Sequence, residues 1–343
     1  MAEPDYRAYA GAGMGALHRW YDPSTGQWNG TGWWNAANAL TAVIAYTKLT
    51  GDTTYEAVIG TTFIAAQRQH ANFINSYHDD NAWWALAWIA AYDLTRNTRY
   101  LDIARTIFAH NTTGWDDTCG GGLWWNQARN YKNAITNELF LTLAAQLHLR
   151  TPGDHAGYLA WAQREWDWFS ASGLIGPSGL VNDGLSKDCT NNGGPTWTYN
   201  QGVILGGLGA LSECTGDRAY LEQAEIIASV ACRTLVTPPG SPGSTGSPGI
   251  LTESCETAFG GCSSDQVQFK GIFMRNLYDL WRRTSEPNHR AFILSNASSV
   301  WDNNKNAANE FGALWTGPFD QADAGRQSSA LDSLIAAAAT SAN

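Results

Sequence analysis

Two adjacent carboxylates are the strongest candidates for chemistry in this sequence. Asp79 and Asp80 stand in the segment YHDDNAWWALAWIAAYDLT, directly before a long apolar stretch that contains Trp83, Trp84 and Trp88. A retaining glycosidase needs two carboxyl groups about 5–5.5 Å apart, and an inverting one needs about 6.5–9.5 Å. Neighbouring side chains at a helix start suit the shorter range, so the pair predicts retaining glycosidase chemistry. The alternative interpretation is that Asp79 or Asp80 is only a helix N-cap.

Aromatic rings and amides gather in the segments 119–138, 179–202 and 269–276. Sugars stack their C–H faces on rings, and their hydroxyls need directional donors and acceptors. These segments therefore predict a carbohydrate site, although the same indoles could pack in a core and the same amides could cap helices. The predicted substrate-binding residues are Trp124, Trp125, Asn133, Asn137, Asp183, Tyr199, Asn200, Gln201, Lys270 and Arg275.

A recurring phrase reveals the elements that must position these residues. An apolar stretch, a threonine, a polar turn and an aromatic residue recur at 45–58, 91–104, 148–162, 211–224 and 280–293, which indicates helical hairpins. The stretches before the turns are apolar nearly all round, which is typical of buried helices, and those after them are amphipathic. We expect inner helices at 33–49, 81–95, 132–149, 198–213, 269–283 and 327–339. We expect outer helices at 5–20, 54–69, 98–110, 156–170, 218–235 and 288–300.

Six inner and six outer helices in alternation predict an all-α fold, the (α/α)6 barrel, with residues 1–343 as a single domain. Connections from outer to inner helices are long and must emerge at one end of the barrel, where long loops usually carry function. Any β-structure would be short hairpins in these loops. The Pro/Gly/Ser-rich segment 236–250 is expected to be a flexible excursion away from the chemistry.

Composition excludes several classes of protein. Aromatic residues are abundant, with 17 tryptophans, which argues against disorder. No apolar run approaches the roughly 20 residues that cross a bilayer, so we expect no membrane span. The net charge of −10 and the lack of a basic stripe argue against nucleic acid as a partner. We place Trp84, Trp88, Trp161, Trp166 and Trp168 in packing between helices, and Trp33, Trp124, Trp125 and Trp197 at the loop end.

Six cysteines, four of them in loops, predict disulfides and an oxidising compartment. Among the 15 possible connectivities we favour Cys255–Cys262, Cys119–Cys189 and Cys214–Cys232; six buried thiols are the alternative. No cysteine has zinc-ligand spacing, so no metal is expected. The start of the sequence, MAEPDYRAY, lacks the basic and apolar regions of a signal peptide, so the protein is either cytosolic or secreted with a signal peptide outside this sequence. The cysteines favour the secreted protein.

The chain resembles family 76 glycoside hydrolases, the α-1,6-mannanases. The resemblance lies in YHDDNAWWALAWIAAYDLT, CGGGLWWN…YKNAITNELF, GLVNDGL…C…NNGGPTWTYNQGVILGGL and FKGIFMRNL, and it covers roughly residues 5–340. It implies an (α/α)6 barrel that hydrolyses α-1,6-linked mannose with retention. It further implies Asp79 as nucleophile, Asp80 as general acid and base, and Asp183 as a sugar-binding residue.

The expected substrate is therefore α-1,6-mannan or its oligosaccharides, cut within the chain by a monomeric enzyme without a cofactor. Related fungal wall proteins are thought to act as transglycosidases on lipid anchors that bear mannan. The absence of an anchor signal favours the hydrolase, and transglycosylation remains the alternative. A non-catalytic mannan-binding protein is a second alternative. A barrel-type epimerase would need a histidine pair, and only His70 and His78 are near the expected position.

Overall fold

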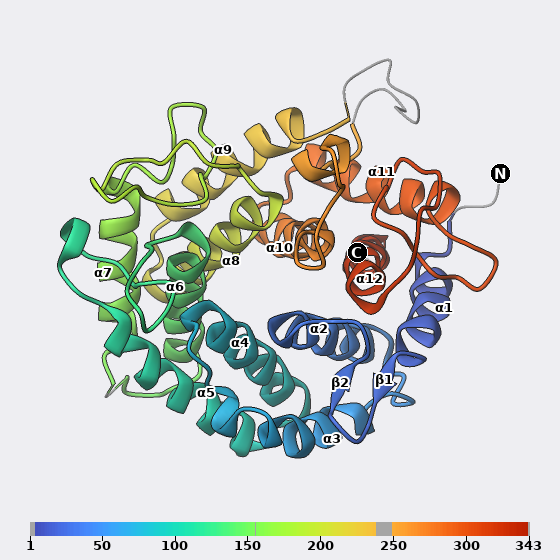
Figure 1. Cartoon of the computed structure of the whole chain (residues 1–343), viewed down its shortest axis with the longest axis horizontal. Helices are drawn as coiled ribbons and strands as arrows, with labels where there is room; N and C mark the ends of the chain where they lie inside the picture. Colours follow the sequence, from blue (N-terminus) through green and yellow to red (C-terminus); the bar gives the residue numbers. More distant parts are fainter. Residues whose placement is uncertain (1–3, 155, 238–248, 342–343) are drawn as a thin grey trace. The chain divides into compact units, whose positions relative to one another are not determined.

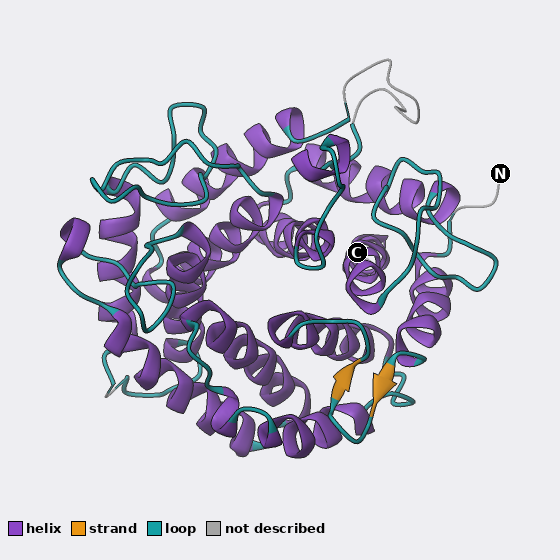
Figure 2. Ribbon diagram, viewed as in Figure 1, coloured by secondary structure: helices purple, strands orange, loops and turns teal. Residues whose placement is uncertain are grey.

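The computed structural model describes residues 4–154, 156–237 and 249–341, and within them it is all-α with twelve α-helices. Figure 2 shows that the sheet is confined to two short strands, β1 (Tyr21–Asp22) and β2 (Gln27–Trp28), which pair antiparallel. The alternation of inner and outer helices is as predicted, with boundaries that differ by only a few residues. Most of the Pro/Gly/Ser segment 236–250 lies outside the described residues.

The helices, labelled in Figure 1, fall into two compact units by their contacts: residues 1–68 with 231–343, and residues 69–230. The prediction of a single domain stays a prediction. The first unit contains α1 (Tyr6–His18), α2 (Trp33–Thr50), α3 (Ala57–Ala65), α10 (Phe269–Thr284), α11 (Pro287–Asn303) and α12 (Ala324–Ser341). The second contains α4 (His78–Thr95), α5 (Thr98–Asn111), α6 (Ala134–His148), α7 (Tyr158–Ala171), α8 (Thr198–Thr215) and most of α9 (Ala219–Thr234).

In the second unit the predicted inner helices α4, α6 and α8 lie side by side, and α5 and α7 pack against them. Helix α8 is buried along almost its whole length, as its run of Gly, Ala, Leu and Ile predicts. A Cβ atom at Gly207 would lie only 2.9 Å from the Thr142 hydroxyl of α6. The small residues therefore allow these two helices to approach closely.

In the first unit the Ala-rich α12 packs against α1, α2, α10 and α11. A Cβ atom at Gly271 of α10 would lie 2.5 Å from the backbone of Ser329 in α12, so only glycine fits there. The backbone amide of Gly271 donates to the Ser329 hydroxyl at 2.9 Å. Close backbone contact therefore replaces side-chain packing at this crossing.

The recurring sequence phrase forms the tight turn from an inner to an outer helix. Inner helices α2, α4, α8 and α10 each end on a residue in the left-handed conformation: Gly51, Arg96, Gly216 and Ser285. A polar side chain of the turn then accepts backbone N–H groups at the start of the next helix. Asp217, for example, accepts from Ala219 at 2.9 Å, and Asp154 accepts from Tyr158 at 2.7 Å. This capping explains why four of the five copies carry Asp or Asn after the threonine; in the copy at 280–293 the capping side chain is Glu286.

Two of the three predicted disulfides are present, Cys119–Cys189 and Cys255–Cys262. The prediction of Cys214–Cys232 is wrong, because neither residue is in a disulfide. Cys214 is at the end of α8, whereas Cys232 is thirteen residues into α9. With a rise of 1.5 Å per residue, that position is about 20 Å along the helix from the turn that joins the two helices.

Candidate active site

Asp79 and Asp80 lie in the first turn of α4 and are both half-buried. The N-cap of this helix is Tyr77, whose side chain makes no capping bond, so the interpretation of either aspartate as an N-cap is wrong. Carboxylates in a first turn are favoured by the positive end of the helix dipole. The two carboxyl groups therefore keep their oxygens for other partners.

Both oxygens of Asp79 accept hydrogen bonds from N–H groups. The indole of Trp125 donates to Oδ2 at 2.9 Å, and the backbone amide of Asp80 donates to Oδ1 at 3.0 Å. Burial and the neighbouring charge of Asp80 raise the pKa of Asp79 well above its ordinary value, and these two donors act in the opposite direction. The loop that carries Trp125 is thus part of the site.

His78 fastens that loop to the start of α4. Its backbone amide donates to the Trp125 carbonyl at 2.9 Å, and its Nδ1 lies 2.8 Å from the Trp124 carbonyl. Burial lowers the pKa of His78, which favours the neutral ring. His78 is therefore a buried structural residue that sets the position of the indole on Asp79.

Asp183 is an acidic side chain in the loop between α7 and α8 of the second unit. The hydroxyl of Tyr131 donates to its Oδ2 at 2.5 Å, and Asn192 donates to the same hydroxyl at 3.0 Å. Burial raises the pKa of Asp183, while hydrogen bonds from Tyr131 and Trp197 lower it. Tyr131 was not predicted from the sequence, because its partner is 52 residues away.

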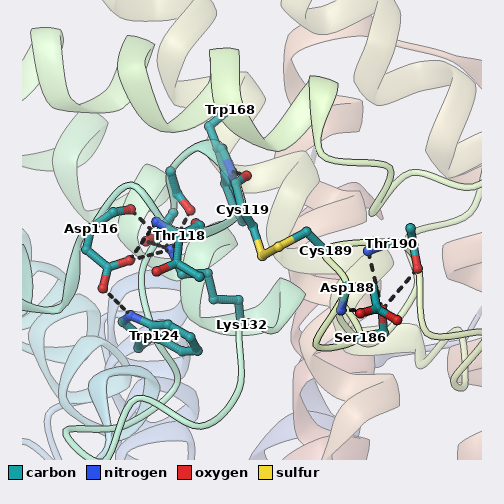
Figure 3. The surroundings of a disulfide bond; sticks show 12 residues. Asp116, Thr118, Cys119, Trp124, Lys132, Trp168, Ser186, Asp188, Cys189 and Thr190 are labelled. Atoms are coloured by element: carbon teal, nitrogen blue, oxygen red, sulfur yellow. Dashed lines mark hydrogen bonds and ion pairs between the residues drawn. A yellow bond between two sulfur atoms is a disulfide. The ribbon is translucent and has the colours of Figure 1, made fainter.

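A buried lysine organises the loop between α5 and α6, as Figure 3 shows. The Lys132 ammonium pairs with Asp116 at 3.0 Å and binds the carbonyls of Thr118, Gly121 and Gly122. Beside it, the Cys119–Cys189 disulfide joins this loop to the one between α7 and α8. The loops that carry Trp125 and Asp183 are therefore covalently linked.

Trp124, predicted as a stacking surface for sugars, is half-buried in the same loop between α5 and α6. Its indole donates to Asp116 at 2.7 Å, and Lys132 lies 5.0 Å from its ring centre (Figure 3). With Trp124 and Lys132 as partners, Asp116 has a structural role in this loop.

Two predicted sugar ligands bind the protein backbone instead. The Asn137 amide accepts from the Leu123 N–H at 2.6 Å and donates to the Leu123 carbonyl at 3.1 Å. Gln201 binds the N–H and the carbonyl of Val181 in the same way, both at 2.8 Å. Both side chains have no exposed surface. The prediction that they contact substrate is corrected, because backbone groups already satisfy their amides.

The two predicted cations lie in the first unit and are paired with acids. Lys270 is buried, forms an ion pair with Glu256 at 2.5 Å and donates to the Ala313 carbonyl at 2.8 Å. Its predicted role in binding sugar is therefore corrected to a structural one. Arg275 pairs with Asp332 at 3.0 Å; burial raises the pKa of that acid to about 6, and Arg275 opposes the shift.

Three more residues of the second unit place polar atoms in its interior. Glu138 and Asn200 have no exposed surface, and neither side chain has a hydrogen-bond partner among the described residues. Burial, with a smaller effect of Asp183, raises the pKa of Glu138 well above its usual range. Asn133, the N-cap of α6, is 5% exposed, and its Oδ1 is likewise unsatisfied. Tyr199 is half-buried in the first turn of α8.

In the parts of the chain that the structure covers, no three histidine, cysteine or acidic side chains are grouped to hold a metal ion. Across the same ranges, none of the helices combines the length and the apolar character that a bilayer crossing requires.

Comparison with known proteins connects this geometry to a family. Residues 7–343 match the family described as Glycosyl hydrolase family 76. The chain belongs to glycosyl hydrolase family 76. The match covers both units and includes Asp79, Asp80 and Asp183.

Curated relatives of this family 76 chain come from fungi. A putative mannan endo-1,6-alpha-mannosidase of Schizosaccharomyces pombe is 30% identical over 264 residues, which cover 71% of this chain and 57% of the relative. The mannan endo-1,6-alpha-mannosidase DCW1 of Saccharomyces cerevisiae is 27% identical and is matched over 88% of this chain and 71% of its own length. The chain thus spans little more than half of the first of these relatives.

Solved structures of the family give the fold. The α-1,6-mannanase GH76A of Salegentibacter is 26% identical and superimposes with a TM-score of 0.84, covering 98% of this chain and 100% of that one. An inactive variant of the same enzyme, with two consecutive aspartates replaced by alanine, was solved with α-1,6-mannotetrose. Dfg5 of Chaetomium thermophilum, in complex with glucosamine, is 20% identical with a TM-score of 0.84 over 99% of this chain and 92% of that one. The fold is the predicted (α/α)6 barrel.

Proposed function

We propose that this chain is a retaining α-1,6-mannanase that cuts within mannan chains, with Asp79 as nucleophile and Asp80 as general acid and base. The observation that carries the proposal is the vicinal carboxyl pair at the start of α4, with N–H donors on both oxygens of Asp79. The activity of the named relatives, and the inactivation of the Salegentibacter enzyme by replacing two consecutive aspartates, support it.

The pair shares one proton near neutral pH, because two carboxyl groups this close cannot both ionise without cost. Burial, and after it the charge of Asp80, raise the pKa of Asp79. Donors from Trp125 and the Asp80 amide stabilise Asp79 as the carboxylate. The proposed roles require the shared proton on Asp80, the acid, and the carboxylate on Asp79, the nucleophile.

Two displacements at the anomeric carbon give retention. Asp79 attacks this carbon and forms a glycosyl ester, while Asp80 gives its proton to the departing glycosidic oxygen. Asp80, now ionised, takes a proton from the water that attacks the ester. Asp79 leaves as the carboxylate, and the pair returns to its starting state.

Asp183 and Trp125 are the binding residues that this proposal favours. Both are half-buried, and their two loops are joined by the Cys119–Cys189 disulfide. The carboxylate of Asp183 would accept sugar hydroxyls, and the Trp125 ring would stack against a mannose face. Contacts of substrate with Trp124, Asn133, Tyr199, Asn200 and Arg275 stay predictions. We further propose a secreted monomer, supported by the two disulfides, which persist in oxidising compartments.

The test is hydrolysis of unbranched α-1,6-mannan by the wild type and by Asp79→Asn and Asp80→Asn. Each variant should lose most turnover while it keeps the fold, and the exposed Asp117→Asn should act as the wild type does. NMR should show the α-anomer as the first product, and an early spread of oligomer sizes should indicate cutting within the chain. Near wild-type activity of either variant at the pair would reject the assignment.

Two other outcomes would redirect the proposal. Products longer than the added oligosaccharides would indicate transglycosylation by the same carboxyl pair. Binding of mannan without turnover at high protein concentration would indicate a carbohydrate-binding protein.

A further inference from the structure

The proposed general acid has a neighbour that was not predicted from the sequence. Asn75 lies in the loop before α4, is half-buried, and donates from its Nδ2 to Oδ2 of Asp80 at 2.6 Å. This bond is stronger when Asp80 is ionised, and it persists when the proton is on Oδ1, because Oδ2 is then still an acceptor. This contact therefore fixes one oxygen of the carboxyl group.

The backbone of Asn75 is itself held by α4. The side chain of Asn81, which is completely buried, accepts from the Asn75 backbone N–H at 2.8 Å and donates to the Asn75 carbonyl at 3.4 Å. Asn81 also donates to Asn111 of α5 at 3.4 Å, and Asn111 donates to the His78 carbonyl at 2.8 Å. A chain of buried amides thus connects the loop to the same helix turn that carries Asp80.

The orientation of the Asn75 side chain follows from a backbone donor. Its Oδ1 accepts the Tyr77 N–H at 2.8 Å, which closes a turn typical of asparagine. A backbone N–H can only donate, so the atom that faces it must be the amide oxygen. The NH2 group is therefore the one that faces Asp80, and Asn75 can donate to this carboxyl group but cannot accept from it.

We propose that Asn75 is a positioning residue for Asp80: it occupies Oδ2 with a donor, so that the acidic proton is carried on Oδ1. This inference rests on the proposed function, because it concerns the step in which Asp80 protonates the leaving oxygen. A proton on Oδ2 would face the amide N–H and lose that hydrogen bond. The proton is thus confined to one oxygen and to one direction, and the carboxyl group cannot rotate without breaking the contact.

The experiment compares Asn75→Asp and Asn75→Ala with Ser76→Ala as the matched control. Aspartate keeps the shape and the acceptor for Tyr77 but replaces the donor that faces Asp80 by an oxygen. Ser76 is the next residue of the same loop and is exposed, and among the described residues its only hydrogen bond is the one that its backbone carbonyl accepts from Gln127. Each variant is assayed on α-1,6-mannotetraose and on a 2,4-dinitrophenyl α-1,6-mannobioside with azide present.

The two substrates separate positioning of the acid from general damage. The dinitrophenolate group leaves without protonation, and azide attacks the glycosyl ester without a general base, so the second reaction bypasses both roles of Asp80. We expect kcat on mannotetraose to fall about 10–100-fold in both Asn75 variants, with a small change in KM. On the dinitrophenyl substrate with azide, kcat should stay within about threefold of the wild type. Ser76→Ala should match the wild type on both.

Each result decides the question. Equal losses of kcat on both substrates, or no loss on mannotetraose, would overturn the role of Asn75. Asp80→Asn is measured in parallel and should show the same dependence on the leaving group in stronger form. If Asp80→Asn shows no such dependence, or the wild type hydrolyses neither substrate, the proposed function has failed.

Discussion

Glu138 offers a quantitative test of the electrostatics of the second unit. Its carboxyl group has no exposed surface and no hydrogen-bond partner among the described residues, and burial raises its pKa well above 4.5. The folded protein therefore holds this proton more tightly than the unfolded chain does. The stabilising effect of the proton is fully present below the unfolded pKa of about 4.5, and it is lost as pH rises toward the folded pKa.

The size of the effect follows from linkage. Between the two pKa values, each pH unit lowers the free energy of unfolding by about 1.4 kcal/mol through this one group. Glutamine has nearly the same shape as glutamate but carries no titrating proton. The free energy of unfolding of Glu138→Gln therefore lacks the pH dependence that Glu138 contributes. The stability difference between variant and wild type should shift in favour of the variant by up to about 3 kcal/mol between pH 5 and pH 7.

The assay is equilibrium unfolding in urea at pH 5, 6 and 7, followed by tryptophan fluorescence. A cost of burying the new amide would displace all three differences equally, so the slope with pH is the result that counts. The second buried acid, Glu165, is present in both proteins. Its contribution to the pH dependence therefore cancels in the stability difference between the variant and the wild type. The control is Glu222→Gln on α9, where solvent surrounds the carboxyl group in both states. A difference that stays constant from pH 5 to pH 7 would refute the reasoning, because Glu138 would then be ionised and paired.

Two further predictions concern the buried lysine of the loop between α5 and α6 and the two disulfides. Lys132→Met should lower the free energy of unfolding by about 3 kcal/mol, measured in urea, because it leaves Asp116 and three carbonyls without their cation; an unchanged midpoint would contradict the role of this lysine. Replacing both Cys119 and Cys189 by serine should cost about 4 kcal/mol, against about 2 kcal/mol for the same change at Cys255 and Cys262, because the bridges span 70 and 7 residues. Equal losses in the two double variants would contradict this order.

The helices were predictable because burial and turn chemistry are local signals. Apolar stretches followed by a polar turn place α8 at 198–213, and the structure has Thr198–Thr215. The division of tryptophans was partly right. Trp84 and Trp88 are buried and contact the rings of Phe73 and Tyr100, but Trp168 is buried against the loop between α5 and α6, where its indole donates to the Cys119 carbonyl. Trp33 is the first residue of α2, at the loop end as predicted, and its side chain is buried there.

The carboxyl pair was predictable because its two members are adjacent in the sequence, whereas its partners were not. Trp125 is 46 residues from Asp79 in the sequence. Only the folded loop shows that the indole N–H, and not the ring face, contacts the Asp79 carboxylate. The pairing of Tyr131 with Asp183 depends on contact between two loops in the same way. Asn75 is only five residues from Asp80, but its role depends on the direction of one amide, which the sequence does not encode locally.

Asn137 and Gln201, which bind backbone groups instead of the predicted sugar, belong to a pattern that recurs at the starts of several inner helices. In α4, α6, α8 and α12 the fourth residue is an amide that binds the backbone of the incoming loop: Asn81 on Asn75, Asn137 on Leu123, Gln201 on Val181, and Gln327 on Phe311 and Asn309. An amide supplies one donor and one acceptor side by side, so it satisfies an N–H and a carbonyl that would otherwise be buried unpaired. Long loops are thereby fixed at the helix starts without a sheet. At α4 this clamp holds Asn75, the residue that fixes the proposed acid, so a device for loop stability also sets the geometry of the carboxyl pair.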